Sequence, residues 1–328
     1  MDTTTFGICS DAHAGLIHDA PERIAIFADA MNEAEVDFVI HLGDLAHTDR
    51  ETDTSRALEA LNRFSGPIFH VIGNHEGDQL SKNAIVDLYH MPAPWYSFDV
   101  NGFHFAVLDT NYYLAEKGSD IGRCIPYAHG NYGKAQADGI TDTINYIPEE
   151  ELRWLEQDLL DAHGPCFLFS HASLAYYPEK HANAHPSDAI KTVLTKINRK
   201  AGYRKVAACF HGHLHADTLD VLNGIYFYQI NSISDYWVGE DGRNTSYASF
   251  IHEKYPAMQY MCPYRDPLYA TVTLDSDLEV MRVIGTSTVF NRYSPKDVGC
   301  DGMQGMGGYY STPAIQNRIL SFETGRPS

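Results

Sequence analysis

Five short polar motifs, each placed directly after an apolar run, constrain this 328-residue chain more than any other feature. The motif Gly73-Asn74-His75-Glu76 follows the run 66–72, which a Gly-Pro turn introduces. The other four motifs are Asp11-Ala12-His13, Gly43-Asp44, Ser170-His171 and Gly212-His213-Leu214-His215. One Asn-His pair after a strand would be an ordinary polar turn. Five such groups predict a shared site, because loops gather at the carboxyl ends of strands in layered α/β proteins.

The apolar periodicity predicts an α/β (α+β) chain with two packed β-sheets and helices outside them. Strands alternate with helices in the first part of the chain, whereas the last part is rich in strands. Strands are expected over 6–9, 36–42, 66–72, 166–169, 205–210, 225–230, 269–274 and 278–284, and helices over 21–34, 52–64, 148–162 and 187–201. The clearest hairpin spans 95–109 and turns at Asn101-Gly102, a strong turn signal.

Two stretches carry no clear period. Residues 110–147 are rich in Tyr, Gly and Asn and predict a long loop or lid at the end of a strand. The chain from Asn291 onward is Gly- and Tyr-rich, which predicts a tail or a cover. We therefore expect one domain over 1–290 with a lid-like insertion at 110–147, followed by a C-terminal tail over 291–328.

The charge balance excludes some partners. The chain has 24 Lys and Arg against 43 Asp and Glu, a net charge of −19, which argues against binding long nucleic acid. An acidic protein that handles anionic substrates needs local positive charge, and bound metal ions would supply it. No apolar run is long enough to cross a membrane, no signal peptide is visible, and the six cysteines form no Cys-x-x-Cys pair. We expect a reduced, cytoplasmic protein with no membrane partner, although a mature fragment whose leader was removed would look the same.

The polar motifs supply two carboxylates, one amide oxygen and four imidazoles. This mixture suits Mn, Fe or Zn, because Ca and Mg prefer oxygen ligands alone. The predicted ligands are Asp11, His13, Asp44, Asn74, His171, His213 and His215. Seven ligands are too many for one tetrahedral ion and suit two divalent or trivalent ions that share a carboxylate. Asp44 is the best bridge, since Gly43 places it on a tight turn in the middle of the set.

The same motifs, in the same order, resemble those of the calcineurin-like metallophosphoesterases, over roughly residues 6–285. The resemblance implies a four-layer fold, two β-sheets flanked by helices, with a dimetal site at the strand ends. By motif position, one ion would take Asp11, His13, Asp44 and His215. The other would take Asp44, Asn74, His171 and His213.

The resemblance also implies roles around the ions. His75 matches the family's catalytic histidine, which contacts the phosphate or protonates the leaving oxygen, and Glu76 would support the catalytic residues His75 and Asp44 from behind. We expect direct hydrolysis by a hydroxide that bridges the ions, with His75 as general acid and no phosphoenzyme. Many members carry an acid three positions after the bridging Asp, where this chain has His47. His47 is either a phosphate or hydrogen-bond contact of the site or a partly exposed loop histidine.

The substrate is expected to be a small phosphorylated, nucleotide-like molecule. Asn74, His75, Asn111 and His47 are the predicted substrate contacts. In the predicted lid, Tyr112, Tyr113, Tyr127, Tyr132 and His129 would stack a base or bond a sugar, or else form a packed aromatic loop.

The segments 109–111, 127–131 and 148–155 resemble the branch of the family with manganese-dependent ADP-ribose and CDP-alcohol pyrophosphatases. Class III cyclic-nucleotide phosphodiesterases share the metal set and remain an alternative, as do a phosphomonoesterase and a nuclease. A different class, a non-catalytic protein-binding module on the same scaffold, is disfavoured because every expected ligand and His75 are present. A homo-oligomer is left open.

Overall fold

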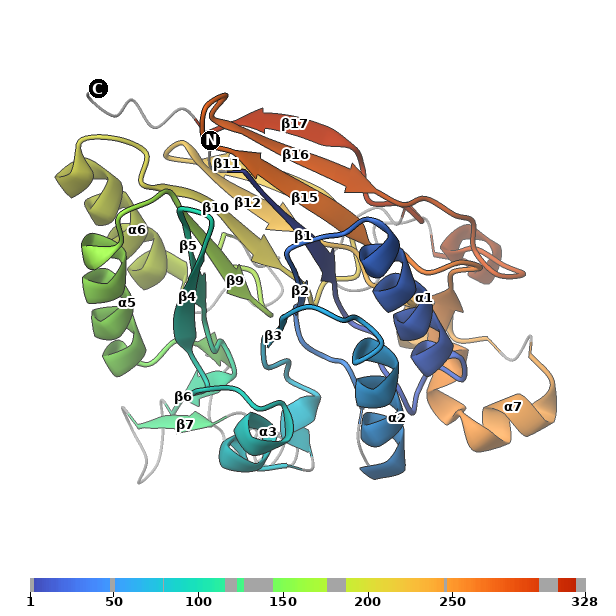
Figure 1. Cartoon of the computed structure of the whole chain (residues 1–328). Coiled ribbons are helices and arrows are strands. Elements are labelled where there is room, and N and C mark those ends of the chain that lie inside the picture. Colours follow the sequence, from blue (N-terminus) through green and yellow to red (C-terminus); the bar gives the residue numbers. More distant parts are fainter. Residues whose placement is uncertain are drawn as a thin grey trace.

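Two six-stranded β-sheets lie face to face with helices on both outer sides (Figure 1). The computed structural model describes residues 3–47, 51–78, 80–115, 123–126, 144–175, 187–244, 247–300 and 312–322. Helices α1 (Ala20–Glu33) and α2 (Glu51–Leu61) flank the first sheet, and α5 (Glu149–Asp161) and α6 (Ser187–Ala201) flank the second. This α/β arrangement in four layers confirms the predicted fold class.

The first sheet is mixed and collects three of the site's loops at one edge. Its order is β17 (Arg318–Ser321), β16 (Val280–Gly285), β15 (Ala270–Asp275), β1 (Thr3–Cys9), β2 (Phe38–His41) and β3 (Ile68–His70). The strands β1, β2 and β3 run parallel, so their carboxyl ends lie together. β17 pairs antiparallel with β16. The segment after residue 291, which the sequence predicted to be a tail or cover, therefore contributes an edge strand to this sheet.

The second sheet delivers the remaining loops. Its order is β11 (Thr218–Leu222), β12 (Ile225–Gln229), β10 (Val206–His211), β9 (Cys166–Ser170), β5 (Phe103–Val107) and β4 (Tyr96–Val100). The predicted β4–β5 hairpin is confirmed, and Asn101 and Gly102 both adopt the positive φ angles that its tight turn requires. β9 and β10 are parallel neighbours, so the segments that follow them also meet at one edge.

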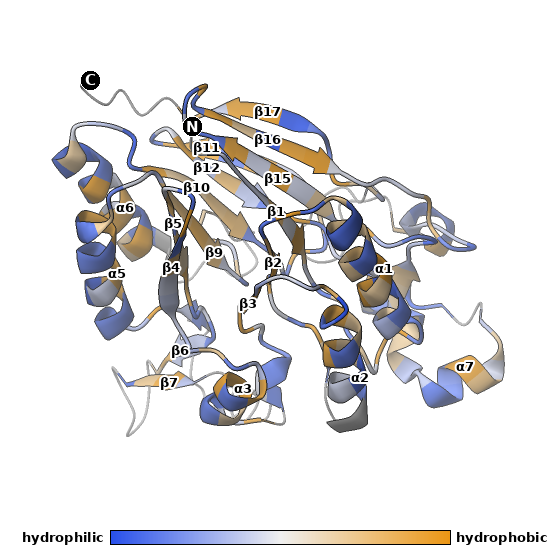
Figure 2. Cartoon of the chain, viewed as in Figure 1, coloured by the Kyte–Doolittle hydropathy of each residue, from blue (hydrophilic) through white to orange (hydrophobic). Residues whose placement is uncertain are grey.

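Aromatic side chains fill the space between the two sheets. The ring of Phe6 on the first sheet meets Phe105, Phe169 and Phe210 of the second edge-on, with centroids 5.8, 5.7 and 5.9 Å apart. Such edge-to-face pairs contribute about 0.5–1.5 kcal/mol each beyond their burial. A second apolar core lies under α5 and α6, whose apolar residues, such as Leu155 and Ile190, pack toward the sheet (Figure 2). The packed sheets thus provide a rigid base for the loops at their edge.

Smaller elements surround that edge. Residues 110–147 were predicted to be a loop, but the structure forms β6 (Tyr112–Leu114), β7 (Cys124–Pro126) and β8 (Ile144–Tyr146) there. Tyr127, His129 and Tyr132 lie outside the described residues. A two-stranded sheet joins β13 (Asp235–Trp237) to β14 (Met261–Pro263). The short helices are α3 (Lys82–Leu88), α7 (Ser249–Lys254), η1 (Glu76–Asp78), η4 (Glu240–Gly242), η5 (Pro256–Tyr260) and η6 (Pro295–Val298).

Two expectations about the chain's chemistry can be compared with the structure. Within the described ranges, no helix combines the length and the apolar character that crossing a bilayer would need. All six cysteines are free thiols, and Cys9, Cys166 and Cys209 are buried in strands, as their apolar surroundings predicted.

Candidate dimetal site

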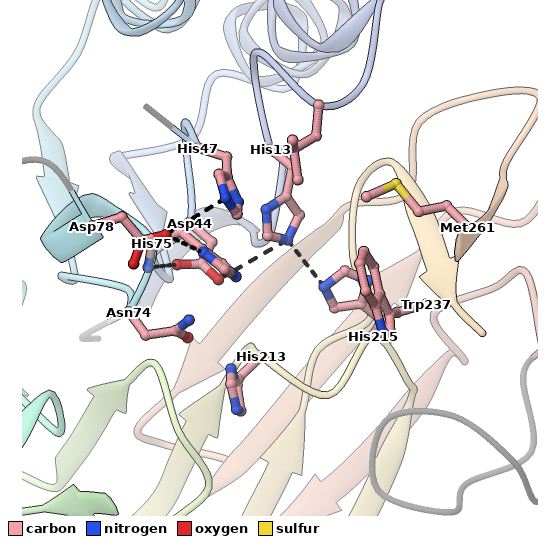
Figure 3. Close-up of a pocket in the computed structure, with 11 residues that line it drawn as sticks. His13, Asp44, His47, Asn74, His75, Asp78, His213, His215, Trp237 and Met261 are labelled. Atoms are coloured by element: carbon pink, nitrogen blue, oxygen red, sulfur yellow. Dashed lines mark hydrogen bonds and ion pairs between the residues drawn. The ribbon is translucent and has the colours of Figure 1, made fainter. Parts of the chain in front are cut away.

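The loops after β1, β2, β3, β9 and β10 bring the seven predicted ligands to one edge of the packed sheets (Figure 3). Five of these residues adopt a left-handed backbone conformation that non-glycine residues rarely take. Their φ angles are 55° at Asp11, 52° at His13, 56° at Asp44, 75° at His213 and 48° at His215. Such conformations cost about 1–3 kcal/mol each and persist only where surrounding contacts enforce them. The local backbone is therefore shaped by the site and not by chain propensity.

Asp11, His13 and His215 form a first group of converging donors. The Nε2 atoms of the two histidines lie 3.1 Å apart, and Asp11 Oδ1 lies 3.8 Å from His13 Nε2 and 3.5 Å from His215 Nε2. Ligand atoms that share one tetrahedral ion at ~2.0–2.2 Å lie about 3.3–3.6 Å apart, so the spacing fits a metal ion. Asp11 Oδ1 is buried and has no hydrogen-bond partner, which a cation between these groups would provide.

Asp44, His171 and His213 form a second group, which Asn74 joins. His171 Nε2 lies 3.1 Å from Asp44 Oδ2 and 3.0 Å from Asn74 Oδ1. His213 Nδ1 lies 3.2 Å from the same nitrogen. These three short separations again fit donors arranged around one ion.

Asp44 stands between the two groups. Its Oδ2 atom lies 3.1 Å from His171 Nε2 and 4.0 Å from His13 Nε2, so one carboxylate oxygen faces both sets of donors. Its Oδ1 atom accepts a hydrogen bond of 2.9 Å from the backbone N–H of His75. This placement supports the bridging position that the motif order indicated for Asp44.

The outer nitrogens of two histidines are held by backbone carbonyls. His171 Nδ1 lies 2.8 Å from the carbonyl oxygen of Leu42, and His215 Nδ1 lies 3.1 Å from that of Asp235. A carbonyl only accepts, so each Nδ1 donates and each Nε2 is left to bind an ion in the neutral ring. Burial lowers the pKa of His213 to about 3, so that ring too is neutral and offers a lone pair.

The two buried carboxylates create a demand for positive charge. Burial opposes the charged form of His171, but the adjacent Asp44 carboxylate outweighs burial and raises the pKa of His171 to about 9. Burial likewise opposes the charge on His215, yet Asp235 and Asp11 hold its pKa well above the ordinary value. In the metal-free chain, protons on these imidazoles balance the carboxylates. A bound cation would replace them.

His75 and His47 lie together on the rim of this site. His75 Nδ1 donates to Asp78 Oδ2 across 2.8 Å, and the rings of His75 and His47 stack with centroids 3.9 Å apart. His47 Nε2 lies 3.5 Å from the same Asp78 oxygen. Burial lowers the pKa of His75, but the carboxylates of Asp44 and Asp78 outweigh it and raise the pKa above the usual value. Of the two interpretations of His47, the structure therefore favours a contact of the site, with 29% of the side chain exposed.

Glu76 joins two of the ligand-bearing loops. Its Oε2 accepts hydrogen bonds from the N–H groups of Asp44 and Gly73, at 3.0 and 2.8 Å. Its Oε1 accepts from the N–H of Leu45 at 2.7 Å and from the Tyr89 hydroxyl at 3.0 Å. The carboxylate is buried and faces the backbone, so Glu76 is a positioning residue behind Asp44 rather than a group that reaches substrate.

Asn111 lies away from the cavity in which the sequence placed it. The residue is buried, and its Nδ2 donates to the carbonyl oxygen of Ile72 across 2.6 Å. Its neighbour Thr110 accepts a hydrogen bond of 3.1 Å from the N–H of Ala172. The strand end therefore braces the loops that carry Asn74 and His171. Counting residues past a strand did not reveal this direction, because the chain turns inward at Asp109, whose Oδ1 accepts from the N–H of Asn111.

Several supporting residues were not predicted. The Ser232 hydroxyl donates to the carbonyl oxygen of Asp11 at 2.8 Å, and the Ser234 hydroxyl donates to that of Ala12 at 3.0 Å. Asp235, which orients His215, ends the same segment. This polar run follows a predicted strand just as the five motifs do, and that position was the signal available. Asp78 carried a signal too, since it lies three residues after His75, within helical reach.

A cavity of about 410 Å³ opens over the donors (Figure 3). It is lined by His13, Leu16, Asp44, His47, Asn74, His75, Asp78, His213, His215, Trp237 and Met261. Asn111 is not among these residues. The opening gives a small molecule access to both donor groups and to His75.

A model of the calcineurin-like phosphoesterases matches residues 4–217, which is more than half of the chain. The chain belongs to this family of phosphoester hydrolases, and the resemblance in the motifs is confirmed. Among curated proteins, the manganese-dependent ADP-ribose/CDP-alcohol diphosphatase of Arabidopsis thaliana is 24% identical over 204 residues. That match covers 51% of this chain and 66% of the relative's length.

Two solved structures share the fold. A dimetal phosphatase from Danio rerio superposes with a TM-score of 0.61 at 15% identity, covering 98% of this chain and 99% of that one. GAP50, described as the anchor in the inner membrane complex of Plasmodium, gives a TM-score of 0.50 at 13% identity, with 90% and 91% covered. At these identities the likeness concerns the fold alone.

Proposed function

We propose that this protein is a two-metal-dependent hydrolase of small phosphodiester or nucleoside-diphosphate substrates. The observation that carries the proposal is the position of Asp44, whose carboxylate lies between two groups of converging donors with His75 on the rim. Asp11, His13, Asp44 and His215 would hold one ion, and Asp44, Asn74, His171 and His213 the other. When bound, two such ions neutralise charge on phosphoryl oxygens and lower the pKa of water. Manganese, iron and zinc all suit this donor set.

The chain's own residues then supply the proton and the orientation. Asp78 fixes the His75 ring through Nδ1, so Nε2 is the nitrogen left to donate to a leaving oxygen. The raised pKa of His75 keeps that proton in place near neutral pH. The described residues that line the cavity include no Ser, Thr or Cys, which supports direct hydrolysis over a phosphoenzyme at such a side chain.

The substrate class is supported by the Arabidopsis relative, whose printed name gives ADP-ribose and CDP-alcohols. The net charge of −19 disfavours a nuclease that binds long strands. A cyclic-nucleotide phosphodiesterase and a phosphomonoesterase need the same donor set and are distinguished by assay. A non-catalytic scaffold is the alternative from a different class, because folds of this kind host unrelated functions.

The test is hydrolysis by the manganese-loaded protein of a phosphomonoester, an aryl phosphodiester, cyclic AMP and ADP-ribose, together with metal content per chain. Asn74→Ala is the matched control, since it removes one metal ligand and leaves His75 in place. We expect two ions per chain and a preference for the diester or diphosphate compounds that the control loses. Absence of turnover on all four compounds, with no metal retained, would overturn the proposal in favour of the scaffold.

A further inference from the structure

The cavity over the metal donors has two chemically different sides. The donors, together with His47, His75 and Asp78, form its polar side, and Trp237, Met261 and Leu16 form its apolar side (Figure 3). The polar side accounts for a phosphate and its ions. An organic substituent on that phosphate would lie against the apolar side, and its chemistry can be inferred from these side chains.

Trp237 and Met261 are fixed to each other by the small sheet. They are directly opposite in the antiparallel β13–β14 pair, so their side chains lie on the same face as cross-strand neighbours. Met261 is fully buried and Trp237 half-buried. The two residues therefore present one continuous apolar surface, and part of the indole is left to solvent or a ligand.

The same strand fixes this surface relative to the metal donors. The carbonyl of Asp235 accepts the hydrogen bond from His215 Nδ1, and Trp237 follows two residues later on the same face of β13. The Ser234 hydroxyl ties the preceding residue to the Asp11–His13 loop. Since one three-residue strand orients a metal ligand and carries the indole, a phosphate at the donors and a group on the indole would be held at a set separation.

Tyr260 supports the indole from the neighbouring chain. Its ring centroid lies 5.7 Å from that of Trp237 at an angle of 38°. The N–H groups of Val238 and Gly239 both donate to the Tyr260 carbonyl, at 2.8 and 3.2 Å. These contacts hold the indole in place before a ligand arrives, which reduces the entropy lost on binding.

We propose that Trp237 and Met261 form a binding surface for the nucleobase of the substrate, an assignment that rests on the proposed function. An indole face stacks on planar rings, and a thioether sulfur makes favourable contacts with aromatic edges. The cavity volume of about 410 Å³ lies within the range of small-ligand sites. A flexible alkyl chain gains less from this pair, because stacking requires a flat partner.

Binding of two product-like phosphates to the manganese-loaded protein tests the proposal. AMP and ribose 5-phosphate share a phosphorylated ribose and differ in the adenine. We expect AMP to bind at least about tenfold more tightly, since a stacked base adds that order of affinity. In Trp237→Ala the two constants should converge through weaker AMP binding, with ribose 5-phosphate unchanged. Trp237→Phe should recover most of the preference, because it keeps a stacking ring.

Tryptophan fluorescence gives a second readout that does not depend on turnover. The chain has three tryptophans, Trp95, Trp154 and Trp237. AMP should quench the emission of the wild type and of the Trp95→Phe and Trp154→Phe controls, but not that of Trp237→Phe. Equal binding of AMP and ribose 5-phosphate to the wild type, or an unchanged preference in Trp237→Ala, would overturn the assignment. Failure of inorganic phosphate to bind would instead indicate that the proposed function itself is wrong.

Discussion

His47 stacks on His75 with ring centroids 3.9 Å apart, and both rings face the carboxylate of Asp78. Many relatives of this type place an acid where this chain has His47, yet the contact with the rim histidine is made here by an aromatic ring. Asp78 holds one nitrogen of His75, while His47 covers one face of its ring. Together they restrict the ring to one orientation, which a proton donor at a phosphate requires.

Loss of the His47 ring should therefore lower kcat and leave KM little changed. We expect His47→Ala to reduce kcat by about 3- to 10-fold, and His75→Ala to reduce it by about 10²–10³-fold, the range for a lost general acid. His47→Phe keeps the stacking surface and should recover most of the loss. Steady-state kinetics on one substrate test this. Equal losses in His47→Ala and His75→Ala would show that His47 contacts the reacting groups itself.

Removing the charge of Glu76 should weaken both the fold and metal binding. In Glu76→Gln one carboxylate oxygen becomes an amide that faces N–H donors, and we expect a loss of about 2–3 kcal/mol in the free energy of unfolding. Metal affinity should fall about 10- to 100-fold, because Asp44 loses its backbone support. Tyr89→Phe removes one of the four donors and should cost about 1 kcal/mol. Urea unfolding and metal titration are the measurements. Wild-type metal affinity in Glu76→Gln would contradict the role.

Asn111 provides a test of position against contact. Asn111→Ala removes the donor to the Ile72 carbonyl next to the Asn74 loop, so metal affinity should drop about tenfold. KM at saturating metal should stay at the wild-type value, because the side chain does not line the cavity. Thr110→Val is the matched variant, since it releases the Ala172 N–H next to His171. A KM that rises several-fold with metal affinity intact would restore the substrate contact predicted from the sequence.

Metal binding should release protons at neutral pH. The Asp44 carboxylate, against the effect of burial, raises the pKa of His171 to about 9, so this ring is protonated in the metal-free chain at pH 7. A metal ion needs the neutral ring, and its apparent affinity should therefore rise with pH up to about 9 and fall toward pH 6. Calorimetry in buffers of different ionisation enthalpy measures the released protons. Asn74→Ala is the control, because its amide does not titrate: affinity should fall while the proton count stays the same.

The sequence predicted the parts of the site that local order encodes. Each ligand follows a strand whose apolar pattern is visible in the sequence, and parallel strands place their ends together, so five motifs sufficed to bring seven residues into one site. Asp235, Trp237 and Met261 were not predicted, because their contacts depend on how β13 and β14 cross the edge of the sheets. The pairing of Trp237 with Met261 joins residues far apart in the chain, and neither strand exceeds three residues.

The same limit explains the error over 110–147. Tyr112–Leu114 is too short to show a period of two, and it pairs with segments that are equally short and distant in the chain. The segment after residue 291 escaped prediction for a related reason: Arg318–Ser321 is a four-residue edge strand whose partner, β16, lies more than thirty residues earlier. Composition described both segments, but long-range pairing decided their structure.

The left-handed backbone at five ligand residues also bears on how such a chain can change over generations. Each of these positions is one where glycine would relieve a strained conformation, and at Asp11 and Asp44 it would also remove a buried charge. A single exchange of this kind would abolish hydrolysis and make the chain more stable, so loss of activity carries no folding penalty at these sites. A hydrolase built in this way can give rise to well-folded, inert descendants in one step, and only continued selection for turnover keeps the ligands in place.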